Sequence, residues 1–519
     1  MFIRRKSNKT GSVSIQVIDK SSGHYRVVKS FGTGCTENEL LALEVQAKQF
    51  IRQKQGLHHD LFEDEEECKI KEFVSSLANS QLQVIGPELI FGTLYDRIGY
   101  NQIQDKKNMF RHLVITRLFN PGSKLKAIDY LLRYQGISYH PDKIYRFLDN
   151  LCFRKASDRK EDIKAQVERI AFNHTKKVLK GKIDVVFYDM TTLYFEASDE
   201  DDLRKAGFSK DGKHQCPQIF LGLLVASQGN PIGYEIFEGN IFEGHTLIPV
   251  LQKMEKQYEL TKPIVIADSG LLSAKNIDSL VEHGYEYILG ARPRSESAGI
   301  RERILGLNLS YDQIAIIHKT ENCRLIISKT EKRAKKDAHN RKRGLLRLEQ
   351  RVASGKLTKS NINNKGYNKY LKLEGDISIS IDRQKYESDA LWDGIKGYLT
   401  NTNLPEKEVI ENYRNLWYIE RAFRMNKTDL EIRPIYHRLK NRIEAHICIC
   451  FTAYTIMLEL ERVLKRNKSQ LSLSRAQELT FNMYQLVYTL PNTLTLTKQI
   501  LQMDQEQLEL YNLVGGYGK

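Results

Sequence analysis

The sequence predicts an α/β protein with a central mixed sheet, preceded by a mainly helical region. Residues 181–295 alternate apolar strand segments with short helical ones. Residues 84–180 carry apolar side chains at helical spacing, and the first residues show alternation typical of a β-hairpin. Together these patterns predict a sheet with helices packed on it.

The composition favours a polyanionic partner. Of 519 residues, 80 are Lys or Arg and 64 are Asp or Glu, which gives a formal net charge of +16. Such a surplus suits nucleic acid or an anionic membrane surface. The longest apolar stretch, Ala445 to Leu458, is too short to span a bilayer and predicts a buried helix. We therefore expect no membrane association.

Cysteine use and the N-terminus favour a cytoplasmic location. The seven cysteines contain no CxxC pair, as expected of reduced thiols. Residues 1–12 are basic, but no apolar segment follows them, so we expect no signal peptide.

The N-terminal part is predicted to be a hairpin, a helix and then a helical region. "SVSIQVI" and "HYRVVKSF" flank the turn-rich "DKSSG", and "TENE" at residues 36–39 is a capping box for the next helix. Further on, Gly136 separates two helical segments by a short turn. Their spacing resembles a helix-turn-helix, so "HPDKIYRFLDNL" either reads DNA or simply packs.

An acidic residue interrupts the first strand of the central region. "VVFYDMTTLYFEA", residues 185–197, has a strand pattern with Asp189 in its apolar run. A buried carboxylate without a partner is costly, so Asp189 either faces solvent at a strand end or belongs to a site. "IFLGLLVAS" and "PIGYEIFEG" are expected to pair antiparallel after it.

A second acidic residue, Asp268, ends the apolar run "KPIVIADSG". The helix "SAKNIDSLVEHG" and the strand "YEYILGAR" follow, and this order with a short crossover predicts parallel neighbours. Ligands of open sheets bind beyond the carboxyl ends of such strands. Residues 296–405 then form a predicted β-rich insertion around the basic segment "KTEKRAKKDAHNRKRG", which is either a solvated helix face or a phosphate contact.

The segment "ENYRNLWYIERAFRMNKTDLEIRPIYHR" is predicted to be one helix, because it is rich in helix formers. Positions seven apart lie almost above one another on a helix, so Tyr413, Glu420 and Lys427 form one stripe. Trp417, next to the stripe, is expected to pack in the core. A helix edge that mixes aromatic and charged residues suits a cleft over a polyanion.

Asp189, Asp268 and Glu420 together predict a metal site. Three neighbouring carboxylates repel one another unless cations neutralise them. Mg²⁺ and Mn²⁺ take oxygen ligands of this kind. Two such ions stabilise the attacking and leaving oxygens of an in-line displacement at phosphorus.

The chain resembles the DDE transposases of bacterial insertion sequences, whose catalytic domain is ribonuclease H-like. The resemblance runs from about residue 185 to 450, in the order of the family, and it implies that Asp189, Asp268 and Glu420 are the catalytic metal ligands. The motifs that carry it are "YDMTTLYFE", "GFSKDGKHQCPQIFLGLLV", "GNIFEGHTL", "IADSGLLS", "DGIKGYLTN" and the helix segment from residue 411 to 438.

The helix signature of the family is Tyr, then Arg three, Glu seven and Lys fourteen positions later. Tyr413, Glu420 and Lys427 match it, but Leu416 occupies the Arg position. Arg424, one turn past the Glu, is a candidate substitute. The resemblance thus implies DNA contacts by Tyr413, Arg424 and Lys427.

The implied activity is that of a transposase with two Mg²⁺ or Mn²⁺ ions. It binds double-stranded DNA at transposon ends, hydrolyses a phosphodiester bond and transfers the 3′-hydroxyl to target DNA. A homodimer and a location in the bacterial cytoplasm, at the nucleoid when bound to DNA, are also expected. A ribonuclease H-like nuclease without strand transfer and a DNA-binding protein that has lost catalysis stay open.

The chain is expected to divide into six segments. These are residues 1–60 (hairpin plus helix), 61–180 (helical DNA-binding region), 181–295 (ribonuclease H-like catalytic domain, first part), 296–405 (β-rich basic insertion), 406–465 (catalytic domain, second part) and 466–519 (C-terminal helical tail).

Overall fold

The computed structural model describes most of the chain and divides it into two compact units. The first unit contains residues 1–83 and 484–501, and the second contains residues 84–483 and 502–519. The first unit therefore extends past the expected boundary at residue 60. The described residues are 1–8, 12–21, 23–34, 36–54, 65–105, 107–152, 161–196, 199–207, 216–241, 243–258, 262–271, 273–355, 357–363, 365–374, 378–489 and 495–515.

The first unit begins with a three-stranded antiparallel sheet in the order β1-β2-β3, with helix α1 packed on it. The predicted hairpin is confirmed as β2 and β3, and β1 adds a strand that was not expected. The backbone N–H of Thr36 donates to Glu39 Oε2 at 3.2 Å, as the capping box predicts. The bounds are β1 Phe2–Ser7, β2 Val13–Asp19, β3 Arg26–Gly34 and α1 Glu37–Lys54.

A second small sheet in this unit joins distant parts of the sequence in the order β16-β15-β4. The prediction of a purely helical tail over residues 466–519 is wrong, because β15 and β16 form an antiparallel hairpin there. Their β-branched and aromatic residues favour strands. The bounds are α2 Glu65–Ser76, β4 Leu82–Val84, β15 Tyr484–Thr489 and β16 Leu496–Ile500.

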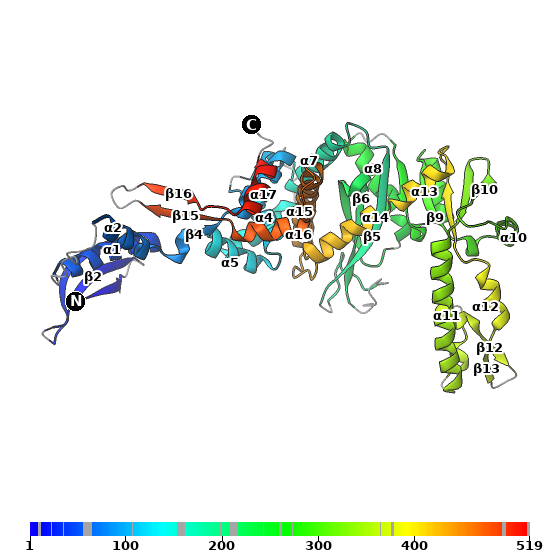
Figure 1. The fold of residues 1–519 in the computed structure, drawn as a ribbon, viewed down its shortest axis with the longest axis horizontal. Coiled ribbons are helices and arrows are strands. Elements are labelled where there is room, and N and C mark those ends of the chain that lie inside the picture. Colours follow the sequence, from blue (N-terminus) through cyan, green and yellow to red (C-terminus); the bar gives the residue numbers. More distant parts are fainter. Residues whose placement is uncertain are drawn as a thin grey trace. The chain divides into compact units, whose positions relative to one another are not determined.

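The second unit opens with helices that pack around the long helix α15 (Figure 1). Gly136 ends α5 with a left-handed φ of 67°, which confirms the predicted turn. Helix α15 is buried along most of its length, as predicted for residues 445–458. The bounds are α3 Thr93–Ile98, α4 Met109–Phe119, α5 Lys124–Gln135, α6 Pro141–Leu151, α7 Ile163–Val178, α15 Lys440–Arg466, α16 Leu473–Leu479 and α17 Gln505–Gly515.

Among the residues that the structure describes, we find no helix whose length and apolar character would let it cross a membrane.

An eight-stranded mixed sheet forms the centre of the second unit, in the order β10-β11-β14-β9-β8-β5-β6-β7. Strands β5, β8 and β9 run parallel, whereas β6 and β7 pair antiparallel beside β5. This arrangement confirms the ribonuclease H-like mixed sheet. The bounds are β5 Val185–Tyr194, β6 Gln218–Ala226, β7 Pro231–Glu238, β8 Ile264–Ala267 and β9 Tyr287–Ala291.

Alternating side chains give this sheet two buried faces. One face packs against α13, α14 and α15, and it is termed the α14 face below. The opposite face packs against α8, α9 and α10. The bounds are α8 Leu247–Tyr258, α9 Ala274–Glu282, α10 Ala298–Gly306, α13 Glu406–Arg414 and α14 Trp417–Arg424.

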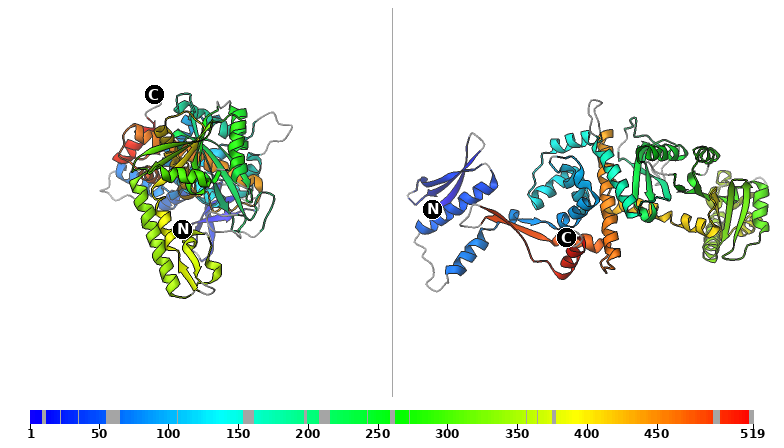
Figure 2. Two further views of the ribbon diagram at one scale, coloured as in Figure 1. Left: turned by 90° about the vertical axis from the view of Figure 1, so that its right-hand side faces the viewer. Right: turned by 90° about the horizontal axis from the view of Figure 1, so that it is seen from above.

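The predicted insertion over residues 296–405 is only partly a separate body. Strands β10, β11 and β14 extend the central sheet, because β14 pairs with β9. Helix α10 packs on the sheet as well, and the remaining elements, α11, the hairpin β12–β13 and α12, lie side by side (Figure 2). The bounds are β10 Ile314–Thr320, β11 Cys323–Lys329, α11 Glu331–Ala353, β12 Leu371–Glu374, β13 Ser378–Ile381, α12 Arg383–Ala390 and β14 Ile395–Thr400.

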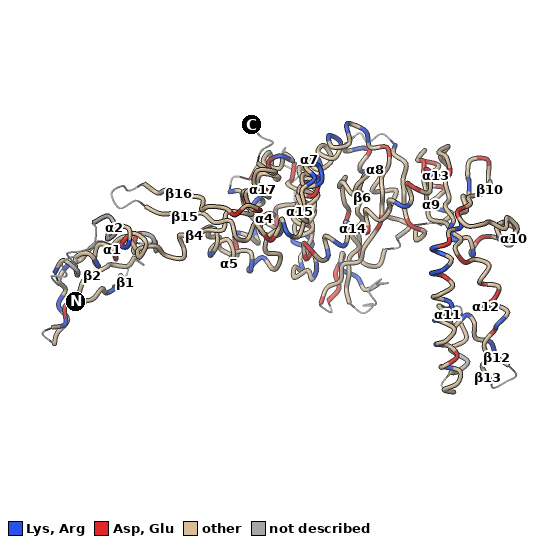
Figure 3. The backbone as a smooth tube through the Cα atoms, in the orientation of Figure 1, with Lys and Arg blue, Asp and Glu red and all other residues tan. Residues whose placement is uncertain are grey.

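Helix α11 contains the predicted basic segment, and Lys and Arg recur along it (Figure 3). Ala334, Leu345 and Leu348 are buried on one side of the helix, and the basic side chains lie on its other faces. The exposed basic side chains are Lys332, Arg333, Lys335, Lys336, Lys342, Arg343, Arg347 and Arg351.

Candidate active site

Strand register places Asp189 and Asp268 at the same level on neighbouring strands. β5 and β8 are parallel, and Tyr188 pairs with Ala267, the last residue of β8. The residue that follows each partner is an Asp. Phe187 and Ile266, two positions earlier, both belong to the core of the α14 face. Side chains two apart on a strand share a face, and both Asp residues therefore belong to the α14 face.

The two Asp residues differ in exposure. Asp189 is half-buried and accepts a hydrogen bond from the backbone N–H of Met190 at 2.7 Å. Asp268 is exposed, and its Oδ1 accepts from the backbone N–H of Ser269 at 2.6 Å. Both carboxylates thus keep at least one fixed donor, which limits their rotation.

Glu420 lies on α14, which packs across β5 on the same face of the sheet. The ring of Tyr418 meets Phe187 of β5 edge-on, with centroids 6.1 Å apart. Glu420 is exposed, whereas Ile419 and Ala422 are buried against the sheet. The helix therefore presents Glu420 at its solvent edge, where its charge acts on Tyr413 and Lys396.

The prediction of one continuous helix from residue 411 is wrong in detail. α13 ends at Arg414, and the backbone N–H of Leu416 and of Tyr418 each bond three residues back, at 3.1 and 3.0 Å. This tighter turn separates α13 from α14. A π-type segment, Met425–Asp429, then follows α14. Its wider turns interrupt the seven-residue stripe between Glu420 and Lys427.

Tyr413 connects α13 to the second Asp. The Tyr413 hydroxyl donates to Asp268 Oδ1 at 3.2 Å, and the side chain is buried. Burial, and then the neighbouring Asp268 carboxylate, raise the pKa of Tyr413 well above that of a free phenol. The hydroxyl therefore stays protonated and orients the carboxylate.

Lys396 of β14 lies next to Tyr413. Its ammonium is 4.5 Å from the centroid of the Tyr413 ring and 5.3 Å from that of Tyr398. Burial, and then the guanidinium of Arg333, lower the pKa of Lys396, whereas Asp268 and Glu420 act in the opposite direction. The Lys396 ammonium therefore interacts electrostatically with the carboxylates of Asp268 and Glu420.

Comparison with known families identifies this arrangement. Residues 180–456, more than half of the chain, match the family model described as the Transposase DDE domain. The chain belongs to the DDE transposase family. It is therefore a transposase, and the match includes all three acidic residues as well as the insertion between Asp268 and Glu420.

Two solved transposase structures are among those to which the chain is similar. The piggyBac transposase synaptic complex with hairpin DNA is 10% identical over 76% of this chain and 76% of that chain, with a TM-score of 0.37. The Mos1 transposase paired-end complex with the left transposon end is 12% identical over 47% and 66%, with a TM-score of 0.16. These TM-scores are low, so the family match carries the assignment. No curated protein matches the chain.

The donor chemistry of the transposase site fits a hard divalent cation, and enzymes of this family use divalent metals. Asp189, Asp268 and Glu420 offer only carboxylate oxygens, on one face of the sheet. Within the described ranges, however, no group of three or more Asp, Glu, His or Cys side chains is gathered closely enough to hold a metal ion.

The other residues predicted for the site differ in how exposed they are. Leu416, at the family's Arg position, is buried, so it contributes to packing. Arg424 is exposed and lies near Asp429. Burial raises the pKa of Asp429, and the Arg424 guanidinium offsets only part of that rise. Lys427 is half-buried in the π-type segment. Trp417 is 46% exposed, so the prediction that it packs in the core is wrong.

Sequence reasoning missed several groups at this site. Lys396 lies within the motif "DGIKGYLTN", where a lysine in an apolar strand gives the same signal as Asp189. The 3₁₀ turn Glu243–His245, from the motif "GNIFEGHTL", lies beside the turn Ser269–Leu271 that follows Asp268. The part of "GFSKDGKHQCPQIFLGLLV" at residues 208–215 lies outside the described residues.

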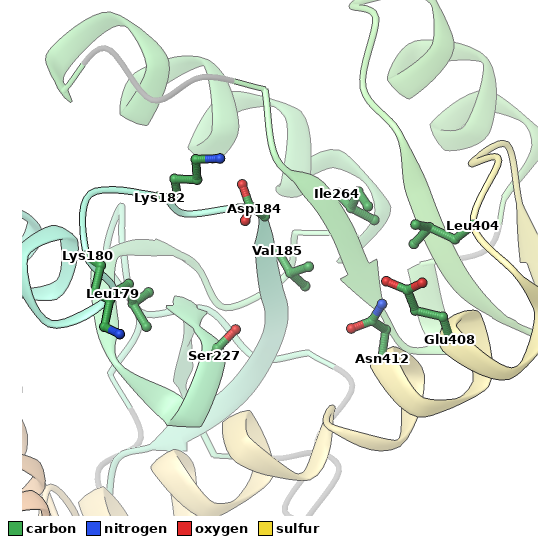
Figure 4. Close-up of a pocket in the computed structure, with 10 residues that line it drawn as sticks. All are labelled: Leu179, Lys180, Lys182, Asp184, Val185, Ser227, Ile264, Leu404, Glu408 and Asn412. Atoms are coloured by element: carbon green, nitrogen blue, oxygen red, sulfur yellow. The ribbon is translucent and has the colours of Figure 1, made fainter.

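Figure 4 shows a surface pocket whose lining residues do not include Asp189, Asp268 or Glu420. It opens where β5 and β8 begin, at Val185 and Ile264, and so at the opposite end of β8 from Asp268. Lys182, Asp184 and Glu408 give it mixed charge. The pocket is therefore distinct from the candidate active site.

Proposed function

We propose that Asp189, Asp268 and Glu420 form the metal-binding triad of this transposase. The observation that carries the proposal is the common level of the two Asp residues on parallel strands, with Glu420 on the helix that crosses β5. When bound, two Mg²⁺ or Mn²⁺ ions would stabilise the attacking and leaving oxygens of a displacement at phosphorus. The three carboxylates would hold these ions.

The residues around the triad would orient the DNA strand. The Tyr413 hydroxyl fixes Asp268 and would keep its second oxygen free to turn toward the cation site. Arg424 and Lys427 would contact backbone phosphates, Arg as a fork and Lys as a point charge. With the strand held in line, hydrolysis at the transposon end leaves a 3′-hydroxyl, which then attacks a phosphodiester of target DNA.

We also propose a homodimer as the active complex, because both ends of the transposon must be cut. The helical region over residues 61–180 is proposed to bind DNA, with Lys143 and Arg146 exposed on α6. The net charge of +16 supports DNA as the partner. The proposed setting is the bacterial cytoplasm, at the nucleoid.

DNA cleavage is expected to require a divalent metal, whereas DNA binding is expected to occur without one. The test uses the full chain and a duplex that ends in the terminal inverted repeat flanking its gene. Mg²⁺ or Mn²⁺ should support nicking and joining to a second DNA, and a chelator should abolish both without abolishing the gel shift. Mn²⁺ should also raise the unfolding temperature of the wild type more than that of Asp268→Asn. Metal-independent cleavage would contradict the proposed triad.

Lys427→Ala is expected to lower cleavage or joining about tenfold, because the phosphate is no longer held in line. If Lys427 were only an exposed helix lysine, its substitution should change stability by less than about 0.5 kcal/mol and leave activity intact. Lys336→Ala, on the exposed part of α11, is the matched control. Equal damage by both substitutions, measured with the same cleavage assay, would assign Lys427 to the general basic surface.

A further inference from the structure

Lys396 occupies a position where a lysine is costly. It lies in β14, between the buried residues Gly397 and Tyr398 on one side and the half-buried Ile395 on the other. Tyr398 belongs to the core of the α14 face, and alternation places Lys396 on that face as well. Strand interiors are depleted in Lys. A packing role alone would be served better by an apolar residue.

The Lys396 ammonium is held by the tyrosine that contacts the triad. The ring of Tyr413 lies 4.5 Å below the ammonium, and the same side chain donates its hydroxyl to Asp268. The Tyr398 ring meets the Tyr413 ring edge-on, with centroids 5.1 Å apart. Cation–π contacts of this kind hold a charged head without neutralising it. The ammonium is therefore fixed one aromatic ring away from the Asp268 carboxylate.

The charges around Lys396 leave room for an additional anion. Arg333 of α11 and Arg414 of α13 both act on Lys396 as like charges, and Asp268 and Glu420 act as opposite charges. Once Asp268 and Glu420 are engaged by cations, Lys396 and Arg414 have no counter-charge among these neighbours, whereas Arg333 also pairs with Asp337 at 3.6 Å. A phosphate group of a DNA strand has the charge and the acceptor oxygens that would satisfy them.

We propose that Lys396 binds a backbone phosphate of the DNA strand at the triad and thereby positions the phosphodiester that is cut. The inference rests on the proposed function, because it takes Asp268 and Glu420 as metal ligands. Arg333 and Arg414 would extend the same phosphate path from β14 onto α11 and α13. Lys396 forms and breaks no covalent bond in this role.

Three substitutions separate this role from packing over the tyrosine rings. Lys396→Met keeps an unbranched side chain over the rings and removes the charge, whereas Lys396→Arg keeps the charge. Lys329→Met is the matched control, because Lys329 is half-buried in the neighbouring strand β11 and its ammonium lies 5.7 Å from the Tyr311 ring. Lys329 pairs with Ile395, so it belongs to the opposite face of the sheet.

The decisive measurement is the salt dependence of binding to a duplex ending in the terminal inverted repeat. Lys396→Met should reduce the slope of log affinity against log salt by about 0.9, the loss of one phosphate contact. It should lower cleavage about tenfold with an unchanged unfolding temperature, and Lys396→Arg should restore the slope. A duplex with one neutral methylphosphonate at the cleaved position should weaken binding by the wild type but not further weaken binding by Lys396→Met.

Other results would overturn the inference. An unchanged slope for Lys396→Met, or an equal change for Lys329→Met, would remove Lys396 from the phosphate path. A cleavage loss that accompanies a lower unfolding temperature at an unchanged slope would assign Lys396 to packing. If Asp268→Asn still cleaves, the proposed triad fails; if Asp268→Asn is inactive while Lys396→Met keeps full activity and slope, only the role of Lys396 fails.

Discussion

Asp189→Asn, Asp268→Asn and Glu420→Gln are each expected to lower DNA cleavage by at least about 10³-fold, which corresponds to about 4 kcal/mol of transition-state stabilisation. Each exchange keeps the size of the side chain but removes a charge that would hold a cation. Because neighbouring carboxylates repel one another, removing one should leave the unfolding temperature unchanged or slightly raised. Cleavage rate, gel shift and thermal unfolding of each full-length variant check the expectation.

The controls for the triad come from the same elements. Asp184 directly precedes β5, whereas Asp189 lies in the middle of that strand, and Glu408 is exposed on α13. Both line the pocket away from the site. Asp184→Asn and Glu408→Gln should therefore retain cleavage. If a triad variant nicks DNA at the same rate as these controls, the residue that it changes does not belong to the triad.

Gly290→Ala is expected to disable the site without touching any carboxylate. A Cβ at this position of β9 would lie 2.3 Å from the Tyr413 hydroxyl oxygen and 3.2 Å from the backbone nitrogen of Ser269. The buried Tyr413 ring must move, and its hydrogen bond to Asp268 is lost. Overpacking of this kind costs about 1–3 kcal/mol of stability. The misplaced carboxylate should lower cleavage by up to about 10²-fold.

Tyr413→Phe separates the two effects of Gly290→Ala. The single variant loses only the hydroxyl, so it should cleave more slowly while unfolding near the wild-type temperature. In the double variant the added methyl group no longer meets an oxygen, although the ring carbon Cζ is still 3.0 Å away. Its unfolding temperature should lie above that of Gly290→Ala. A Gly290→Ala protein with wild-type stability and activity would show that the strand yields instead of the tyrosine.

Much of the central sheet could be predicted, because its strands carry local signals. The apolar runs before Asp189 and Asp268 predicted β5 and β8, and the short crossover predicted that β8 and β9 are parallel. Strand alternation then fixed the face of each Asp. The common level of the two residues could not be predicted, since strand pairing between β5 and β8 joins segments far apart in the sequence.

The departures from prediction have local causes. β1 contains three basic residues in six positions, "FIRRKS", which hide its strand pattern. The hairpin β15–β16 has a local strand signal in "YQLVYT", which contradicts the expectation of a helical tail. The turn between α13 and α14 and the π-type segment contain no Gly or Pro, so packing rather than sequence chemistry sets them. That same packing leaves Trp417 exposed.

The role inferred for Lys396 depends on tertiary structure. The sequence shows only a lysine between apolar residues, and the contact with Tyr413 joins β14 to α13. Gly290 is similar, because its φ is not left-handed and only the approach of the Tyr413 hydroxyl explains why a side chain is excluded. Both positions become informative once the α14 face is assembled.

The chain leaves the central sheet at Lys329 of β11 and returns at Ile395 of β14, and these two residues are direct partners in the antiparallel pairing. Neighbouring strands lie about 5 Å apart, so the entry and exit points of α11, β12–β13 and α12 are fixed regardless of what lies between them. The entropy of closing a loop rises only slowly with its length. In evolutionary terms, this segment can lengthen, shrink or be exchanged while β9, β14 and the face that carries Asp268 keep their geometry.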